Sequence, residues 1–252
     1  MESVRMIHSL QELHSITILG KNCLSMESHQ LRLLLATAFF IIFDLVLTFT
    51  NQDELRFFSK PFIIPCLALI YISYANIIKG MLWKDSIIIG LLFSWLGDVF
   101  LKLDGMFIPG LISFLIAHIF YIIFFVKTCS GNTSFFKLRP VMLIAVLAYL
   151  IELMHLLWPH LGGMKIPVLA YGITISVMLS AALWQYQKLD TKTALYFIVG
   201  AAFFVLSDSI LAINKFRNAF NNAGIYIMIT YIIAQVFIVM GAIRYRTIKN
   251  EE

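Results

Sequence analysis

Charge is scarce in this sequence. Only 13% of its 252 residues are Asp, Glu, Lys or Arg, whereas 60% are hydrophobic, more than the roughly 45–50% apolar content of soluble domains. A soluble chain of this length cannot bury so much apolar surface, and a membrane protein does not need to bury it. The composition therefore excludes an ordinary soluble domain and predicts a membrane protein.

Cysteine is also rare, and several catalytic signatures are missing. Cys23, Cys66 and Cys129 form no CxxC pair and no zinc spacing, so a disulfide framework is not expected. The sequence contains no HExxH or HxxxH pair, no GxSxG and no phosphate-binding loop ending in GK[ST]. We therefore predict no bound metal and no organic cofactor.

The positive charge does not form a nucleic-acid-binding stripe. The net charge of +5 arises from basic residues between apolar runs, where Lys and Arg act as topology signals. With a cytoplasmic N-terminus, 13 of the 19 Lys and Arg residues fall in inside segments. We therefore predict no nucleic-acid partner and, with eight spans, both termini in the cytoplasm.

Eight apolar segments follow an N-terminal stretch of mixed polarity. Each approaches the length of about 20 residues that a bilayer-spanning helix needs, and they lie at 31–50, 61–78, 85–103, 107–127, 140–158, 166–187, 193–213 and 224–243. We predict an all-α polytopic membrane protein with eight transmembrane helices. Its parts are a polar or amphipathic tail over residues 1–30, a membrane domain over 31–245 and a C-terminal tail over 246–252.

Four carboxylates interrupt the odd-numbered segments at a similar depth. Asp44, Asp98, Glu152 and Asp208 lie 12–15 residues in, or roughly 20 Å at about 1.5 Å per residue. An ionisable group inside a membrane costs about 2.5–3.5 kcal/mol and usually serves a function or faces a polar cavity. The pattern favours one polar cavity open to the outer side. The alternatives are a structural hydrogen-bonding role for Asp44 and an interfacial pair of Glu152 with His155.

Polar residues of other segments are able to reach the same cavity. A metal site of His118 with Asp98 and Asp208 is an open alternative, as is a purely structural buried His118. The further candidates are Lys60, His118, Tyr171, Ser207, Tyr231 and Gln235.

Five stretches, in order and spacing, resemble the YhhN-like family of lysoplasmalogenases. They are "SKPFIIPCL", "FSWLGDVFL", "FIPGLISFLIAHIFYIIFF", "VLSDSILAINKF" and "YIMITYIIAQVFI". The resemblance covers roughly residues 35–245 and implies an eight-helix hydrolase of a bacterial inner membrane or the endoplasmic reticulum. The implied substrate is a lysoplasmalogen, a lysophospholipid whose single chain is joined by a vinyl ether. The implied products are a fatty aldehyde and glycerophosphocholine or glycerophosphoethanolamine.

By motif, the resemblance also implies which residues form the site. The candidates that match its motifs are Lys60, Asp98, His118, Tyr171, Ser207, Asp208, Tyr231 and Gln235. We predict that Asp98 and Asp208 form the catalytic acid/base pair, and the sequence does not distinguish the acid from the base. The other six are predicted to bind the substrate, with Lys60 on the lipid phosphate. Vinyl-ether hydrolysis begins with protonation of the β-carbon and passes through an oxocarbenium ion. Two carboxylates suit this chemistry, as they do in glycosidases. No metal or organic cofactor is required.

Two other functions use similar features. Buried carboxylates in a helical bundle also suit a proton-coupled transporter of lipids or small molecules, although no paired broken helices are visible. A metal-dependent membrane lipid hydrolase is the third possibility. The predicted partners are a lysophospholipid and membrane lipids. The sequence carries no signal for oligomeric state, because lipid-facing and subunit-facing apolar surfaces look alike.

Overall fold

A computed structural model describes residues 28–50, 52, 54–74, 85–128, 140–186 and 188–251. Within these ranges the chain is helical and contains no strand. Apart from its last three residues, the predicted N-terminal tail lies outside the described residues.

The described helices follow the predicted apolar segments closely. The first, Ser28–Phe49, is called here the N-terminal helix. The others are α2 (Arg56–Tyr74), α3 (Ser86–Lys102), α4 (Phe107–Thr128), α5 (Pro140–Leu157), α6 (Lys165–Trp184), α7 (Thr191–Ala212) and α8 (Ala223–Glu251). Two 3-10 turns, η3 (Trp158–His160) and η4 (Gly162–Met164), join α5 to α6, and a π-helical turn, η5 (Ile213–Arg217), extends α7.

Seven of the described helices are long and apolar enough to cross a membrane. The prediction of an all-α polytopic membrane protein is therefore confirmed. α3 has 17 residues and lies at the lower limit of about 17–25 residues for a span. The count of eight spans and the cytoplasmic location of both termini stay predictions.

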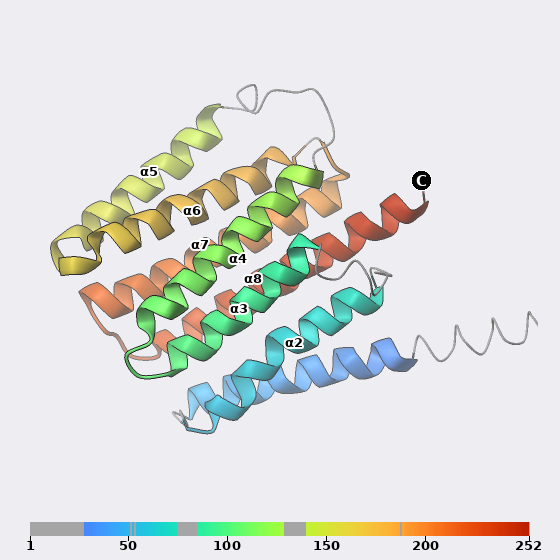
Figure 1. Cartoon of the computed structure of the whole chain (residues 1–252), viewed down its shortest axis with the longest axis horizontal. Helices are drawn as coiled ribbons and strands as arrows, with labels where there is room; N and C mark the ends of the chain where they lie inside the picture. Colours follow the sequence, from blue (N-terminus) through green and yellow to red (C-terminus); the bar gives the residue numbers. More distant parts are fainter. Residues whose placement is uncertain are drawn as a thin grey trace, which may run out of the picture.

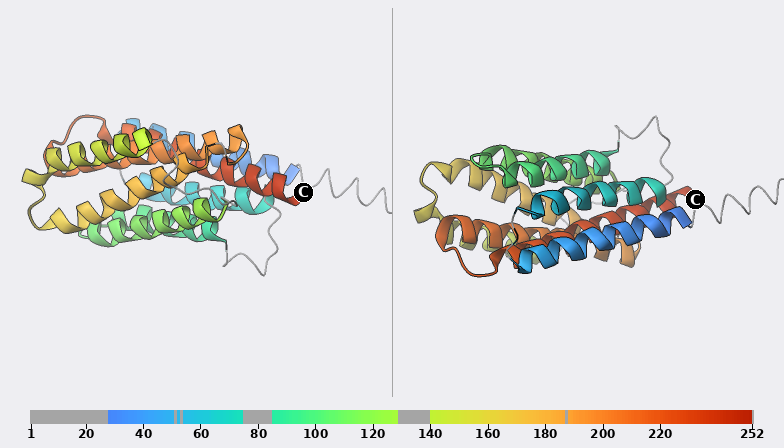
Figure 2. Two further views of the ribbon diagram at one scale, coloured as in Figure 1. Left: turned by 90° about the horizontal axis from the view of Figure 1, so that it is seen from above. Right: turned by 90° about the horizontal axis from the view of Figure 1, so that it is seen from below.

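The helices run along one long axis (Figures 1 and 2). The N-terminal helix and α2 form one edge of the bundle, and α5 forms the opposite edge (Figure 1). α3, α4, α7 and α8 lie between these edges, and α5 packs mainly against α6. The end of α8 and the turn between α5 and α6 lie at opposite ends of the bundle. Two of these central helices carry predicted carboxylates: Asp98 lies near the C-terminal end of α3, and Asp208 near that of α7.

Small residues let α3 approach α4 closely. A Cβ on Gly90 would lie 2.5 Å from the Tyr121 ring, and one on Gly97 would lie 2.6 Å from the Phe114 ring. Helix pairs in membranes associate through such close packing of small residues. This contact places two large aromatic rings of α4 in the bundle core, beside α3.

A proline inside α2 creates a polar contact with α3. Pro65 has no backbone N–H, so the carbonyl of Pro61 loses its usual helical partner. The indole Nε1 of Trp95 donates a hydrogen bond of 2.8 Å to that carbonyl. A freed backbone group inside a membrane needs such a substitute, and the bond fixes α2 beside α3 near Lys60.

Candidate active site

The first half of the site joins α2, α3 and α8 around Asp98. The Nζ of Lys60 lies 2.8 Å from Oδ1 of Asp98. The Tyr231 hydroxyl donates a hydrogen bond of 2.7 Å to Oδ2 of the same carboxylate. Asp98 is 2% exposed, so a buried carboxylate is held between an ammonium group and a phenol.

The second half joins α4, α6 and α7 around Asp208. The Tyr171 hydroxyl donates a hydrogen bond to Oδ2 of Asp208. The Nε2 of His118 lies 3.9 Å from the same oxygen. Neither a Lys nor an Arg among the described residues forms an ion pair with Asp208. The two aspartates therefore differ in their partners: one has a permanent cation and the other has neutral or titratable neighbours.

His118 is a buried polar residue without a hydrogen-bond partner in the described part of the chain. Both of its ring nitrogens are inaccessible and unpaired. Its ring packs edge-on against Phe204 and Tyr171, with centroid distances of 4.6 and 5.3 Å. Leaving a buried polar group unsatisfied costs about 1–3 kcal/mol. A small polar group near Asp208, such as a water molecule or a substrate hydroxyl, would satisfy it.

Aromatic rings connect the two halves. Phe204 contacts His118 on one side and Tyr231 on the other, where the ring centroids are 5.6 Å apart. Tyr231 bonds to Asp98 and His118 lies beside Asp208. The ring of Phe204 therefore links the surroundings of the two carboxylates.

Gln235 belongs to a hydrogen-bond chain behind Asp98. Its Nε2 donates to the Tyr231 hydroxyl at 3.3 Å, and its Oε1 accepts from the Tyr121 hydroxyl at 2.9 Å. Tyr121 also shares a hydrogen bond of 3.2 Å with Ser94. Tyr121 and Ser94 were not among the site residues predicted from the sequence. Helical spacing was the available signal, because Tyr121 lies three residues after His118 and Ser94 four before Asp98.

Ser207 lies beside the site but points elsewhere. Its hydroxyl donates a hydrogen bond of 3.1 Å to the backbone carbonyl of Ile227 in α8. This contact ties α7 to α8. Substrate binding by Ser207, which the sequence motif implied, gains no support from this placement.

The prediction that four carboxylates share one polar cavity is wrong for Glu152. Glu152 is exposed on α5, as is His155, so this pair faces away from the interior. Asp44 is fully buried in the N-terminal helix. It accepts a hydrogen bond of 2.7 Å from Ser59, and Nε of Arg56 lies 3.6 Å from it. Three carboxylates, rather than four, lie in the bundle interior at this level.

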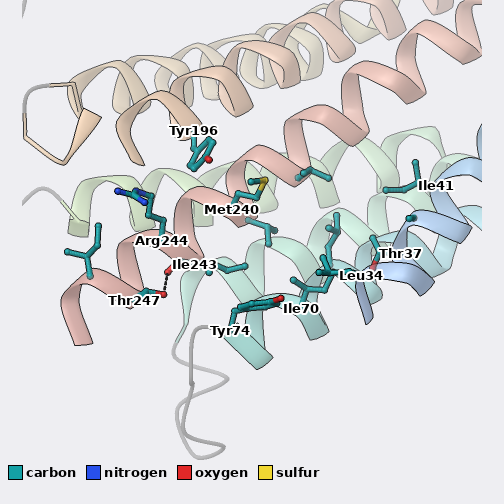
Figure 3. A pocket seen from close by; sticks show the side chains of 15 residues that line it. Leu34, Thr37, Ile41, Ile70, Tyr74, Tyr196, Met240, Ile243, Arg244 and Thr247 are labelled. Carbon is teal, nitrogen blue, oxygen red and sulfur yellow. Dashed lines mark hydrogen bonds between the residues drawn. The ribbon is translucent and has the colours of Figure 1, made fainter. Parts of the chain in front are cut away.

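The cavities distinguish Asp208 from Asp98. Asp208 and Tyr171 line two small hollows of about 40 Å³ each, one toward α5 and one toward α4. A larger cavity, of about 760 Å³, lies instead between the N-terminal helix, α2, α7 and α8 (Figure 3). It extends from Ile41 to Arg244 and Thr247 (Figure 3). No residue of the two aspartate clusters lines it, whereas Asp208 lines both small hollows.

A metal site with three or more His, Cys, Asp or Glu ligands is not formed by the described residues. Of the metal site considered above, only His118 and Asp208 are neighbours, with Nε2 of His118 at 3.9 Å from Oδ2 of Asp208. The prediction of no cofactor is not tested by this geometry.

Comparisons with known proteins agree on one family. Residues 55–242 match the sequence model of the YhhN family. Human lysoplasmalogenase TMEM86B is 29% identical over 202 residues, which cover 77% of this chain and 79% of that protein. Human lysoplasmalogenase TMEM86A is 30% identical over 175 residues, covering 64% of this chain and 66% of its own length. No solved structure matches the chain.

Proposed function

The chain belongs to the YhhN family, and we propose on this premise that it is a lysoplasmalogenase acting within a bacterial inner membrane or the endoplasmic reticulum. The substrate is a lysophospholipid with one vinyl-ether chain. The products are a fatty aldehyde and glycerophosphocholine or glycerophosphoethanolamine. Relatives that bear this name support the activity. The observation that carries the mechanism is a buried aspartate, Asp98, and a mostly buried one, Asp208, with different partners.

Asp208 is the proposed proton donor. It has no permanent cation beside it among the described residues, and its one close hydrogen bond comes from the neutral Tyr171 hydroxyl. It also lines the two small hollows of about 40 Å³ each, which Asp98 does not line. The proton of its carboxylic acid passes to the β-carbon of the vinyl ether, which leaves an oxocarbenium ion at the α-carbon.

Asp98 is the proposed ionised partner. The Lys60 ammonium stabilises its negative charge at 2.8 Å. A carboxylate in this position stabilises the oxocarbenium ion electrostatically and accepts a proton from the attacking water. The water oxygen bonds to the α-carbon, and the hemiacetal then breaks its bond to the glycerol oxygen. That oxygen takes the hemiacetal proton, and the proton held by Asp98 restores Asp208.

The surrounding polar residues position these groups. Tyr171 and Tyr231 orient the two carboxylates through their hydroxyls. Gln235 orients Tyr231 in turn. The unpaired nitrogens of His118 are suited to hold the water or the free glycerol hydroxyl near Asp208. Lys60 contacts Asp98 rather than the bundle surface, so its proposed phosphate role becomes secondary to its charge on Asp98.

The test measures aldehyde release from lysoplasmenylcholine and lysoplasmenylethanolamine by purified protein in detergent, with and without a chelator. We expect chelator-resistant release that Asp98→Asn and Asp208→Asn abolish. Asp85→Asn is the matched control, because Asp85 is also a buried aspartate of this chain but contacts Tyr71 and Arg246 instead. Full activity in folded Asp98→Asn and Asp208→Asn proteins would contradict the two-carboxylate mechanism. No aldehyde from folded wild-type protein would contradict the activity.

A further inference from the structure

An apolar groove lies along the edge of the bundle, close to the hollow that Asp208 lines. It has a volume of about 360 Å³ and lies between α5, α6 and α7. We call it the α5–α7 groove, with walls that include Ala145 and Tyr149 from α5, Leu179 and Leu183 from α6, and Ala202 and Val205 from α7. α5 packs mainly against α6, which leaves the groove open sideways to the membrane.

The groove adjoins the hollow at Asp208. Tyr149 and Val205 line both spaces, and Asp208 itself lines the hollow. Tyr149 shares a hydrogen bond with Ser209 at this boundary, so a rotation of the Tyr149 side chain would join the two spaces. The 760 Å³ cavity in Figure 3 does not adjoin the hollow in this way, because none of its lining residues also lines a space that touches Asp208.

The length and size of the groove suit one hydrocarbon chain. From Tyr171 at Asp208 to Leu183 at the far end, α6 rises roughly 18 Å at about 1.5 Å per residue. That is close to one leaflet, or half of the about 30 Å hydrocarbon core. Its volume falls in the range of about 300–1,000 Å³ that is typical of small-molecule sites.

On the side of Asp208 away from the groove, one positive charge is placed to attract a phosphate. The hollow toward α4 is lined by Phe107 and Phe216 beside Asp208. The Nζ of Lys215 lies 5.2 Å from the centroid of the Phe107 ring, and Lys215 is exposed. A lipid whose chain fills the α5–α7 groove therefore has its headgroup on the side of Asp208 that carries Lys215. Lysine is a common point-charge ligand of phosphate.

We propose that the α5–α7 groove binds the single hydrocarbon chain of a lysophospholipid and admits it sideways from the membrane. The vinyl-ether carbons then lie at Asp208, and the phosphate lies toward Lys215. The identity of this chain as the cleaved one rests on the proposed function.

A photoreactive lipid tests the location directly. The probe is a 1-O-alkyl lysophosphocholine, which has no vinyl ether to cleave, with a diazirine at the end of its chain. We expect crosslinks to map to the groove walls on α5 and α6, between Met142 and Val146 and between Leu179 and Leu183. Crosslinks around Ile70 and Met240 in the 760 Å³ cavity, or none, would overturn the assignment. Equal labelling by a diacyl phospholipid with the same group would indicate bulk lipid and would also overturn it.

A matched pair of alanines sharpens the test. Ala145 lines the groove and Ala148 does not, yet both are exposed on α5. We expect Ala145→Trp to reduce groove labelling about tenfold and Ala148→Trp to leave it unchanged. Ala202→Trp, at an exposed lining position of α7, replaces Ala145→Trp if that variant does not fold. Equal labelling of all folded variants would contradict the proposal.

Catalysis provides a second, separable readout. Ala145→Trp should lower kcat/KM for long-chain substrates about tenfold more than for short-chain ones, because the indole blocks the groove beyond the reacting carbons. Ala148→Trp should leave the ratio unchanged, and equal ratios in both variants would count against the proposal. Groove labelling by a wild-type protein that releases no aldehyde would contradict the proposed activity and retain the groove as a lysophospholipid site.

Discussion

Asp85 and Asp98 are two buried aspartates associated with the same helix, and their surroundings differ in a revealing way. Asp85 caps the start of α3, where its Oδ1 accepts a hydrogen bond of 2.9 Å from the backbone N–H of Ile87. Its Oδ2 accepts hydrogen bonds from Tyr71 and Arg246. Asp98 also has a tyrosine and a cation, but it lies inside the helix and accepts no hydrogen bond from a backbone amide of the described residues.

The difference separates a structural carboxylate from a candidate catalytic one. Both oxygens of Asp85 are occupied by groups that fix three helices, α2, α3 and α8, at one end of the bundle. Asp98 instead shares the ring of Phe204 with the surroundings of Asp208, which lies beside a histidine whose nitrogens have no partner among the described residues. Burial and a tyrosine partner are common to Asp85 and Asp98, so they do not identify the catalytic aspartate. A polar group near the site that lacks a hydrogen-bond partner, here the His118 ring, does.

The largest expected effect is on catalysis at Asp208. Asp208→Asn keeps the size and the Tyr171 contact but removes the transferable proton, so kcat should fall about 10²–10⁴-fold. Asp85→Asn should retain kcat per folded molecule. Aldehyde release, normalised to folded protein by size-exclusion chromatography, measures both. Comparable losses in the two variants would show that the comparison misassigns their roles.

A smaller loss is expected at Lys60. Lys60→Ala removes the ammonium that lies 2.8 Å from Asp98, and kcat/KM should fall roughly 10–100-fold because the ionised form of Asp98 loses its counter-charge. Lys60→Arg keeps the charge and should recover part of the loss. A change in KM for phosphate-bearing substrates that is absent for a glyceryl vinyl ether would restore the phosphate role. Unchanged kinetics in Lys60→Ala would exclude both roles.

Asp85 should affect stability rather than chemistry. Asp85→Ala removes a helix cap and leaves Arg246 without this carboxylate, so unfolding in detergent should cost about 2 kcal/mol less. The melting temperature by intrinsic fluorescence checks this. The matched Asp98→Ala variant should lose activity as well as stability, since it leaves the Lys60 ammonium without its buried partner. Activity retained by folded Asp98→Ala protein, or lost by folded Asp85→Ala protein, would contradict the assignment.

The smallest effect is expected at the exposed pair of Asp190 and Arg244. Burial raises the pKa of Asp190, but hydrogen bonds from Thr193 and Arg244 outweigh it and hold the pKa below its ordinary value of 3.8. A depressed folded pKa means that this stabilisation is present above about pH 4 and is lost as the pH falls through the folded pKa. Such surface pairs contribute about 0.2–1 kcal/mol. Arg244→Ala should therefore lower the melting temperature slightly at pH 7, and by less as the pH falls below about 4.

Much of the fold could be predicted from hydropathy because each apolar segment satisfies its backbone internally as a helix. The predicted segments 107–127 and 140–158 lie within a residue or so of α4 and α5. The prediction was least exact where local chemistry extends a helix, as at α2, which begins at Arg56 rather than at Pro61.

The site could be predicted only in part. Motifs and depth identified Asp98 and Asp208, and the structure places both in one interior. Depth alone also selected Glu152, which is exposed. A position along a helix axis does not specify which face of that helix turns inward, and the apolar surroundings of α5 carry no strong periodicity to reveal it.

By itself, the sequence determined that the chain is a helical membrane protein, which residues interrupt its apolar helices and which family it resembles. These properties follow from local composition and order along the chain. Only the tertiary structure decided that Lys60 pairs with Asp98, that Asp208 has His118 and Tyr171 as neighbours, and that an apolar groove adjoins the hollow at Asp208. The reason is geometric: such contacts depend on the rotation and packing of helices that are distant in sequence.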